Sequence, residues 1–98
     1  MKIKITGRHI DVSERLKDYA EKKISKLEKH FQQLIDIHLI LYVEKLDHVA
    51  ELTISGDSVQ FHAREKSSDL YSALDLLIDK IENQISRFKE KIQSRKGF

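Results

Sequence analysis

The sequence predicts one α+β domain over residues 1–98, a two-layer sandwich of four strands and two helices in the order β-α-β-β-β-α. Segments in which apolar residues alternate every second position indicate strands, and two segments with apolar residues every three or four positions indicate amphipathic helices. No proline, internal repeat or linker-like change in composition divides the chain. Because each helix has a single apolar stripe, we expect both to cover the same face of a four-stranded sheet.

The first strand is predicted at residues 2–6, where lysines alternate with isoleucines up to Gly7. Asp11 or Ser13 can cap the helix that follows, and a glutamate three positions after Asp11 has the spacing of a capping box. The apolar stripe of this helix consists of Leu16, Ala20, Ile24, Leu27 and Phe31. Since the helix links two strands, those strands can be parallel neighbours joined by a right-handed crossover.

Three more strands and a long helix complete the predicted fold. The strands are expected at residues 35–43, 49–55 and 59–64, with turns at 45–48 and at Gly56-Asp57. A helix starting at Ser67 or Ser68 has an apolar stripe of Leu70, Ala73, Leu74, Leu77, Ile78, Ile81, Ile85, Phe88 and Ile92. The open face of the sheet is expected to present Lys2, Lys4, His38, Tyr42, Glu51, Thr53, Gln60, His62 and Arg64.

The composition excludes several kinds of site. Without cysteine, the chain has no disulfide scaffold, thiolate metal site or cysteine nucleophile. The longest apolar run, residues 39–43, is far below the ~20 residues of a membrane-spanning helix, so we expect a cytoplasmic protein without a membrane partner. The sequence has no nucleophile motif, no phosphate-binding glycine loop and no histidine spacing of the zinc-binding type. We therefore expect a protein that is not an enzyme and that binds no cofactor or metal. Asp75 and Asp79, one helical turn apart, leave a metal-dependent hydrolase as a distant alternative.

Basic and acidic residues are segregated on both predicted helices, although the net charge is only +2. Each residue of an α-helix is rotated by about 100° from the one before it. This rotation places Arg15, Lys22, Lys26 and Lys29 in one basic stripe of the first helix, with Lys23 at the edge of the stripe. One flank of the second apolar stripe contains Lys80, Gln84, Arg87 and Lys91. The other flank is acidic and contains Asp75, Asp79, Glu82 and Glu90. If the basic flanks face each other, they form a positive channel whose spacing suits RNA phosphates. An ordinary solvated surface explains the pattern equally well.

Several segments resemble the ribosome hibernation promoting factor family, which includes the ribosome-associated translation inhibitor and carries the older label sigma-54 modulation protein. These segments are residues 5–9, 26–28, 43–45 and 69–75, the last followed by Lys80 and Gln84. The most specific of them, Asp-Leu-Tyr-Ser-Ala-Leu-Asp at 69–75, is similar to the family's Asp-Met-Tyr-Ala-Ala-Ile-Asp. The sequence departs from the family at Asn83, where members usually have arginine, so one expected phosphate contact is missing there.

The resemblance implies a bacterial, stationary-phase protein that binds the small ribosomal subunit in the mRNA and tRNA channel and inhibits translation. Taken with the charge stripes, it gives an expected 16S rRNA-binding set of Arg8, Lys22, Lys23, Lys26, Lys29, Lys80, Gln84, Arg87 and Lys91. Because the sequence stops at Phe98, it looks like the family's short form, which implies inactive 70S dimers (100S particles) made with ribosome modulation factor, and a monomer off the ribosome. The alternative is an adaptor or transcription-related modulator whose charged helices bind an acidic protein.

Overall fold

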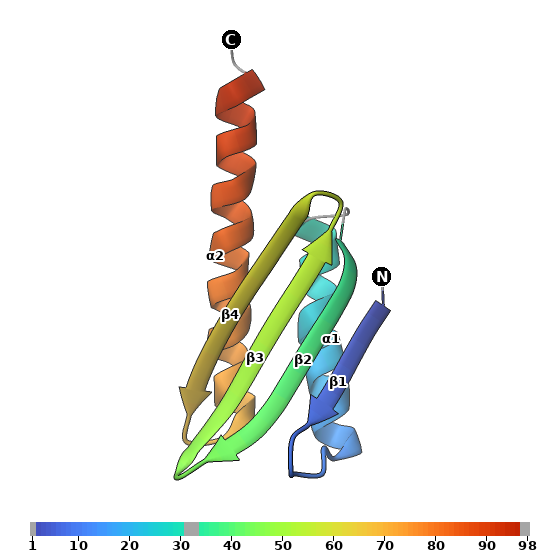
Figure 1. Cartoon of the computed structure of the whole chain (residues 1–98), viewed down its shortest axis with the longest axis vertical. Helices are drawn as coiled ribbons and strands as arrows, with labels where there is room; N and C mark the ends of the chain where they lie inside the picture. Colours follow the sequence, from blue (N-terminus) through green and yellow to red (C-terminus); the bar gives the residue numbers. More distant parts are fainter. Residues whose placement is uncertain (1, 31–33, 97–98) are drawn as a thin grey trace.

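The computed structural model describes residues 2–30 and 34–96, and the side chains of residues 2–29 and 35–91. Its elements are β1 (Lys2–Gly7), α1 (Glu14–His30), β2 (Leu34–Glu44), β3 (Asp47–Gly56), β4 (Val59–Ser67) and α2 (Leu70–Lys96). The strands form one sheet in the order β1-β2-β3-β4, and both helices lie on one face of it (Figure 1). The predicted two-layer α+β sandwich is confirmed.

The sheet is mixed, as its connections require. β1 is parallel to β2, with Ile3 opposite Ile37 and Ile5 opposite Leu39. The strands are parallel because α1 returns the chain to the same end of the sheet at which β1 starts. The pairs β2–β3 and β3–β4 are antiparallel hairpins. The register places the predicted polar side chains together on the open face, where Lys4, His38, Thr53 and His62 form one row across all four strands.

Both hairpin turns are two residues long, and each contains one non-glycine residue with left-handed backbone. Lys45 has φ 59° in the first turn and Ser58 has φ 59° in the second. The predicted tight turn at Gly56-Asp57 is wrong by one position, because Gly56 still pairs with Val59 and the turn therefore begins after it. The expected turn at 45–48 is likewise shorter than predicted, since β3 already begins at Asp47.

The core lies between the sheet and the helices and matches the predicted stripes. Buried side chains from the helices are Leu16, Ala20, Ile24, Leu27, Ala73, Leu74, Leu77, Ile78, Ile81 and Ile85. They pack on Ile37, Leu39, Leu41, Ala50, Leu52, Ile54, Phe61 and Ala63 of the sheet. Each fully buried large aliphatic side chain contributes roughly 1.5–3 kcal/mol to folding. Phe31 and the side chain of Ile92 lie outside the described residues.

Side chains cap both helices at their N-termini. The backbone N–H of Leu16 donates to Ser13 Oγ at 3.1 Å, so Ser13 is the cap of α1. The start of α2 predicted at Ser67 or Ser68 is early, because Asp69 caps this helix. Its Oδ1 accepts the backbone N–H of Ser72 at 2.9 Å, and this hydrogen bond lowers the pKa of Asp69.

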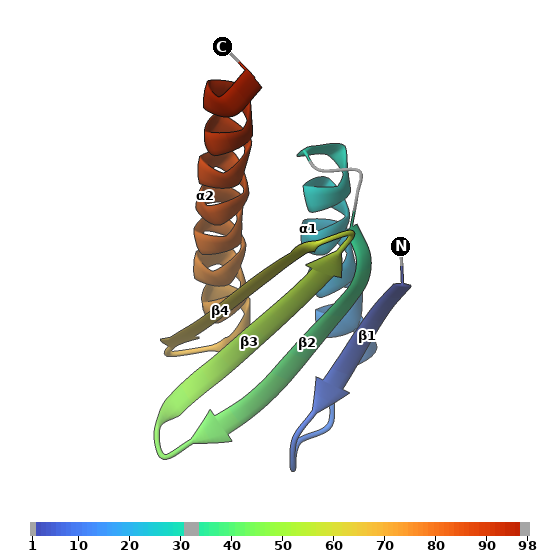
Figure 2. The ribbon, with the colours of Figure 1, turned by 45° about the horizontal axis from the view of Figure 1, so that its top comes forward.

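The helix α2 gives the molecule its elongated shape of 50 × 23 × 18 Å. Its 27 residues span about 40 Å at 1.5 Å per residue. The N-terminal part packs on β3 and β4 and contacts α1, whereas the C-terminal part extends beyond the sheet (Figures 1 and 2). Within the described residues, neither helix has an apolar stretch long enough to cross a membrane.

Candidate nucleic-acid interface

A polar cluster joins the two helices on the covered side of the sheet. The hydroxyl of Tyr19 on α1 donates to Asp75 Oδ1 on α2 at 2.5 Å. Lys23 Nζ lies 3.2 Å from the same oxygen. The Tyr19 ring meets Tyr71 edge to face, with ring centroids 5.0 Å apart and planes at 72°. Asp75 therefore lies against α1 and is shared by two of its side chains.

The cluster fixes the charges at the contact between the helices. The hydrogen bond from Tyr19 holds the pKa of Asp75 below the usual aspartate value, and Lys23 adds to this effect. In return, the Asp75 carboxylate raises the pKa of both Tyr19 and Lys23. At neutral pH the cluster contains an aspartate anion and a lysine cation whose charges cancel. Lys23 is therefore largely compensated inside the protein.

The predicted positive channel between the helices is wrong, because α2 turns its acidic flank toward α1. Asp75 belongs to that flank. The opposite, basic flank faces β4: Lys80 Nζ lies 3.2 Å from Glu65 Oε1, and Gln84 Nε2 donates to the backbone carbonyl of His62 at 2.9 Å. The basic residues of α1 and α2 consequently form two separate surfaces, and Asp75 lies between the helices.

The first of these surfaces, here termed the α1 surface, consists of Arg15, Lys22, Lys26 and Lys29. All four side chains are exposed and line an open hollow together with Asp18, Tyr19, Glu21, Ser25 and Tyr71. Among the described residues, none of the four basic side chains forms an ion pair. Four cations thus border the hollow against two carboxylates, which gives it a positive potential.

The second surface, termed the α2 surface, consists of Lys80, Gln84, Arg87 and Lys91. Lys80 is compensated by Glu65, and the Gln84 amide is engaged by the sheet. Arg87 and Lys91 are exposed, and neither has a carboxylate partner in the part of the chain described. They follow Gln84 toward the segment of α2 that extends beyond the sheet (Figure 1). The uncompensated charge of this surface is therefore concentrated at Arg87 and Lys91.

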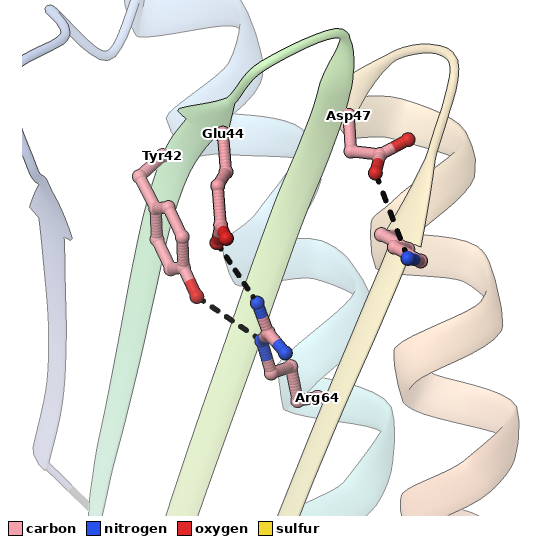
Figure 3. A network of polar contacts seen from close by, with 5 residues as sticks. Tyr42, Glu44, Asp47 and Arg64 are labelled. Carbon is pink, nitrogen blue, oxygen red and sulfur yellow. Dashed lines mark hydrogen bonds and ion pairs between the residues drawn. The ribbon is translucent and has the colours of Figure 1, made fainter.

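Arg8, the remaining predicted site residue, lies on the open face of the sheet, away from both helical surfaces. Its guanidinium carbon is 4.8 Å from the centroid of the Tyr42 ring. From the other side, Arg64 donates through Nε to Tyr42 Oη and through Nη2 to Glu44 Oε2, each at 3.1 Å (Figure 3). Tyr42 also shares this face with Val49, which is only 1% exposed although it lies outside the main core. The arrangement is a small packed cluster.

Sequence reasoning missed Tyr19, Tyr71 and Glu65 as determinants of the interface. The sequence contains a pattern that could have indicated the two tyrosines. Tyr19 stands four residues before Lys23, and Tyr71 stands four residues before Asp75, so each pair lies on one helix face. Which faces meet depends on tertiary packing. The described residues contain no group of three or more histidine, aspartate or glutamate side chains able to hold a metal ion.

Comparison with known proteins gives concordant results. A family model described as "Sigma 54 modulation protein / S30EA ribosomal protein" matches residues 3–93. The chain is 39% identical to a ribosome hibernation promoting factor of Azotobacter vinelandii, over 99% of this chain and 92% of that protein. It is 33% identical to the Salmonella typhimurium protein of the same name, over 95% and 98% of the respective chains.

Solved structures have the same fold. A ribosomal subunit interface protein from Coxiella burnetii superposes with a TM-score of 0.87 at 30% identity, covering 92% of this chain and 99% of that one. The N-terminal domain of Thermus thermophilus Protein Y superposes with a TM-score of 0.80 at 29% identity, covering 90% and 99%. The described fold is therefore shared with both proteins, and the name of the first refers to the ribosomal subunit interface.

Proposed function

The chain belongs to the Sigma 54 modulation protein / S30EA ribosomal protein family, and we propose that it binds the small ribosomal subunit through 16S rRNA phosphates and keeps idle ribosomes from translating. The family is one of ribosome-binding proteins and not of enzymes. The protein acts by occupying the channel that mRNA and tRNA need. This steric mechanism requires shape and charge from the protein and no chemical step.

The uncompensated cations carry the proposal. The α1 surface, together with Arg87 and Lys91, presents six exposed cationic side chains that have no carboxylate partner among the described residues. Lysine and arginine side chains displace condensed counterions when they neutralise phosphates, and this release drives much of RNA binding. Lys23 and Lys80 are compensated by Asp75 and Glu65, so they contribute less than the resemblance alone implies.

The separation of the two surfaces changes how the protein holds RNA. A single strand lying between the helices would meet Asp75 and the acidic flank of α2. The α1 surface and the α2 surface therefore contact different RNA segments, and the rigid two-layer body bridges them. Such bridging suits a site between two parts of a folded ribosomal RNA.

The finer parts of the proposal follow from the similarity to the named relatives. Their shared name, ribosome hibernation promoting factor, supports a role in ribosome hibernation. As a finer part of the proposal, the protein promotes inactive 70S dimers together with ribosome modulation factor. The proposal also includes a cytoplasmic location and a monomeric state when the protein is free of ribosomes. Arg8 belongs to the proposed contact set as a third, separate point of contact on the open sheet face.

Sedimentation with purified 30S, 50S and 70S particles over a salt series tests the proposal. We expect binding to 30S and 70S particles, with an affinity that falls by about one power of salt concentration per phosphate contact. Reversing Lys26 and Arg87 to glutamate should release the protein. The matched control reverses Lys17 and Lys45, which are exposed and lie outside both surfaces. Equal binding of the two double variants would overturn the proposed RNA-binding surfaces.

The alternative, an adaptor for an acidic protein, makes a different prediction in the same system. An RNA-dependent complex is lost after nuclease treatment, whereas a complex with a protein partner survives it. The uncompensated cations favour neither partner by charge sign alone. The ribosomal names of the relatives and of one structural neighbour favour RNA.

A further inference from the structure

Two tyrosines lie in the hollow that the α1 surface borders. Tyr19 and Tyr71 line the same depression as Arg15, Lys22 and Lys26. On α1, these three cations stand at positions i−4, i+3 and i+7 relative to Tyr19, which places them on the same helix face. Aromatic side chains within a positively charged groove are the typical elements of single-stranded nucleic-acid binding, since bases stack on the rings and cations follow the backbone.

The three tyrosines of the chain differ in what already covers their rings. Lys23 Nζ lies 5.5 Å from the Tyr19 ring centroid, so a cation occupies that ring. Tyr42 on the open sheet face is flanked by Arg8 and Arg64, whose guanidinium carbons are 4.8 Å and 6.0 Å from its centroid. Tyr71 has no cation over its ring among the described residues, and Tyr19 is its aromatic neighbour. Tyr71 is the ring available to a ligand.

The position of Tyr71 is fixed before any ligand arrives. Tyr19 is held by its hydrogen bond to Asp75, and it contacts Tyr71 edge to face at 5.0 Å. Tyr71 is itself half-buried against the core. A ring held in this way loses little conformational freedom on binding, which favours affinity.

We propose that Tyr71 stacks with an unpaired RNA base in the hollow, while Arg15, Lys22 and Lys26 bind the phosphates on either side of that base. The inference rests on the proposed function and adds to it a contact with a base. The open sheet face is the weaker site for the same chemistry, because Arg64 and Lys66 are paired there with Glu44 and Asp47 (Figure 3).

Substitution of Tyr71 in the full chain tests this inference, with a labelled single-stranded oligouridine and 30S particles as probes. Tyr71→Phe keeps the ring and should bind within about twofold of the unmodified chain. Tyr71→Leu removes the ring and should bind about fivefold or more weakly, the lower range for one base–aromatic stack. The salt dependence should stay unchanged, because no cation is lost. Tyr71→Phe is therefore the matched control for the loss of the ring.

Tyrosine fluorescence tests whether a base stacks on Tyr71 even if the Tyr71→Leu variant is too unstable to use. The chain has three tyrosines and no tryptophan, so the variant Tyr19→Phe/Tyr42→Phe has Tyr71 as its single fluorophore. Quenching of its emission when oligouridine binds supports stacking. Binding without quenching, normal affinity of a folded Tyr71→Leu, or an equal loss in Tyr71→Phe would each overturn the inference. These results leave ribosome binding by the unmodified chain intact, whereas failure of the unmodified chain to bind ribosomes overturns the proposed function itself.

Discussion

Lys23 Nζ lies 3.2 Å from Asp75 Oδ1, and this ion pair joins α1 to α2 beside the contacts that Tyr19 makes with Asp75 and Tyr71. The pair has two consequences. It contributes to the packing of the helices, and it removes a cation from the set available to RNA. A lysine that sequence similarity assigns to binding is thus partly structural.

Replacing Asp75 with asparagine should separate these two roles. The side chains are 29% (Lys23) and 50% (Asp75) exposed, so solvent screens the pair. We expect the free energy of unfolding to fall by only about 1 kcal/mol. At the same time Lys23 loses its partner, and affinity for 30S particles should rise severalfold. Asp79→Asn is the matched control, since Asp79 is exposed and has no ion-pair partner among the described residues. A larger gain in affinity for Asp79→Asn would contradict this account.

The stabilisation by Asp75 should depend on pH in a defined direction. Its pKa is lowered in the folded protein, first by the Tyr19 hydrogen bond and then by Lys23. The contribution is therefore present above the unfolded pKa of about 3.9 and is lost as the pH falls through the lower, folded pKa. Denaturant unfolding at a series of pH values should show the difference between the unmodified chain and Asp75→Asn shrinking and then disappearing as the pH falls below the ordinary pKa of an aspartate. A difference that does not change with pH would exclude the carboxylate as its source.

The two basic surfaces should act independently on RNA binding. Lys22→Glu/Lys26→Glu changes the α1 surface, and Arg87→Glu/Lys91→Glu changes the α2 surface. Because the surfaces share no contacts among the described residues, we expect their effects on the free energy of ribosome binding to add within about 0.5 kcal/mol. Sedimentation affinities of both double variants and of the quadruple variant give the comparison. Strong non-additivity would indicate that one RNA segment contacts both surfaces.

The cations of the α2 surface should differ in how much they contribute to the affinity for 30S particles. Lys80 is paired with Glu65 at 3.2 Å, whereas Arg87 is exposed without a carboxylate partner in the described chain. Arg87→Ala should therefore weaken 30S binding more than Lys80→Ala. The variant Glu65→Gln should strengthen binding by freeing Lys80. Titration at one fixed salt concentration measures all three, and the reverse order for the two alanine variants would contradict the prediction.

Gly7 is expected to be intolerant of any side chain. A Cβ at this position would overlap the carbonyl oxygen of Ile10 and lie 2.8 Å from Val12 Cγ2. Gly7→Ala should thus lower the free energy of unfolding by about 1–3 kcal/mol, as overpacking does, and reduce the melting temperature by several degrees. Thermal unfolding measures the effect. Lys4→Ala, at an exposed position of the same strand, is the control for a change that adds no atoms, and equal destabilisation of both variants would argue against the steric cause.

The element order and the core were predictable because they depend on periodicity. Leu16, Ala20, Ile24 and Leu27 recur at helical spacing and are buried, and the alternating segment around Leu39 and Leu41 forms the second strand with those residues inside. Boundaries were less accurate. The turn after Gly56 and the cap at Asp69 each depend on local hydrogen bonds for which several neighbouring polar residues are equivalent candidates.

By itself, the sequence determined which residues share a flank of each helix, since 3.6 residues per turn sets their angular positions. It could not determine which flank of α2 faces α1, because the two flanks beside an apolar stripe are equivalent until the helix is placed next to a neighbour. Tertiary packing placed Asp75 toward α1 and Lys80 toward β4. The expected single channel became two surfaces for this reason: charge segregation is a property of one helix, whereas a groove is a property of two.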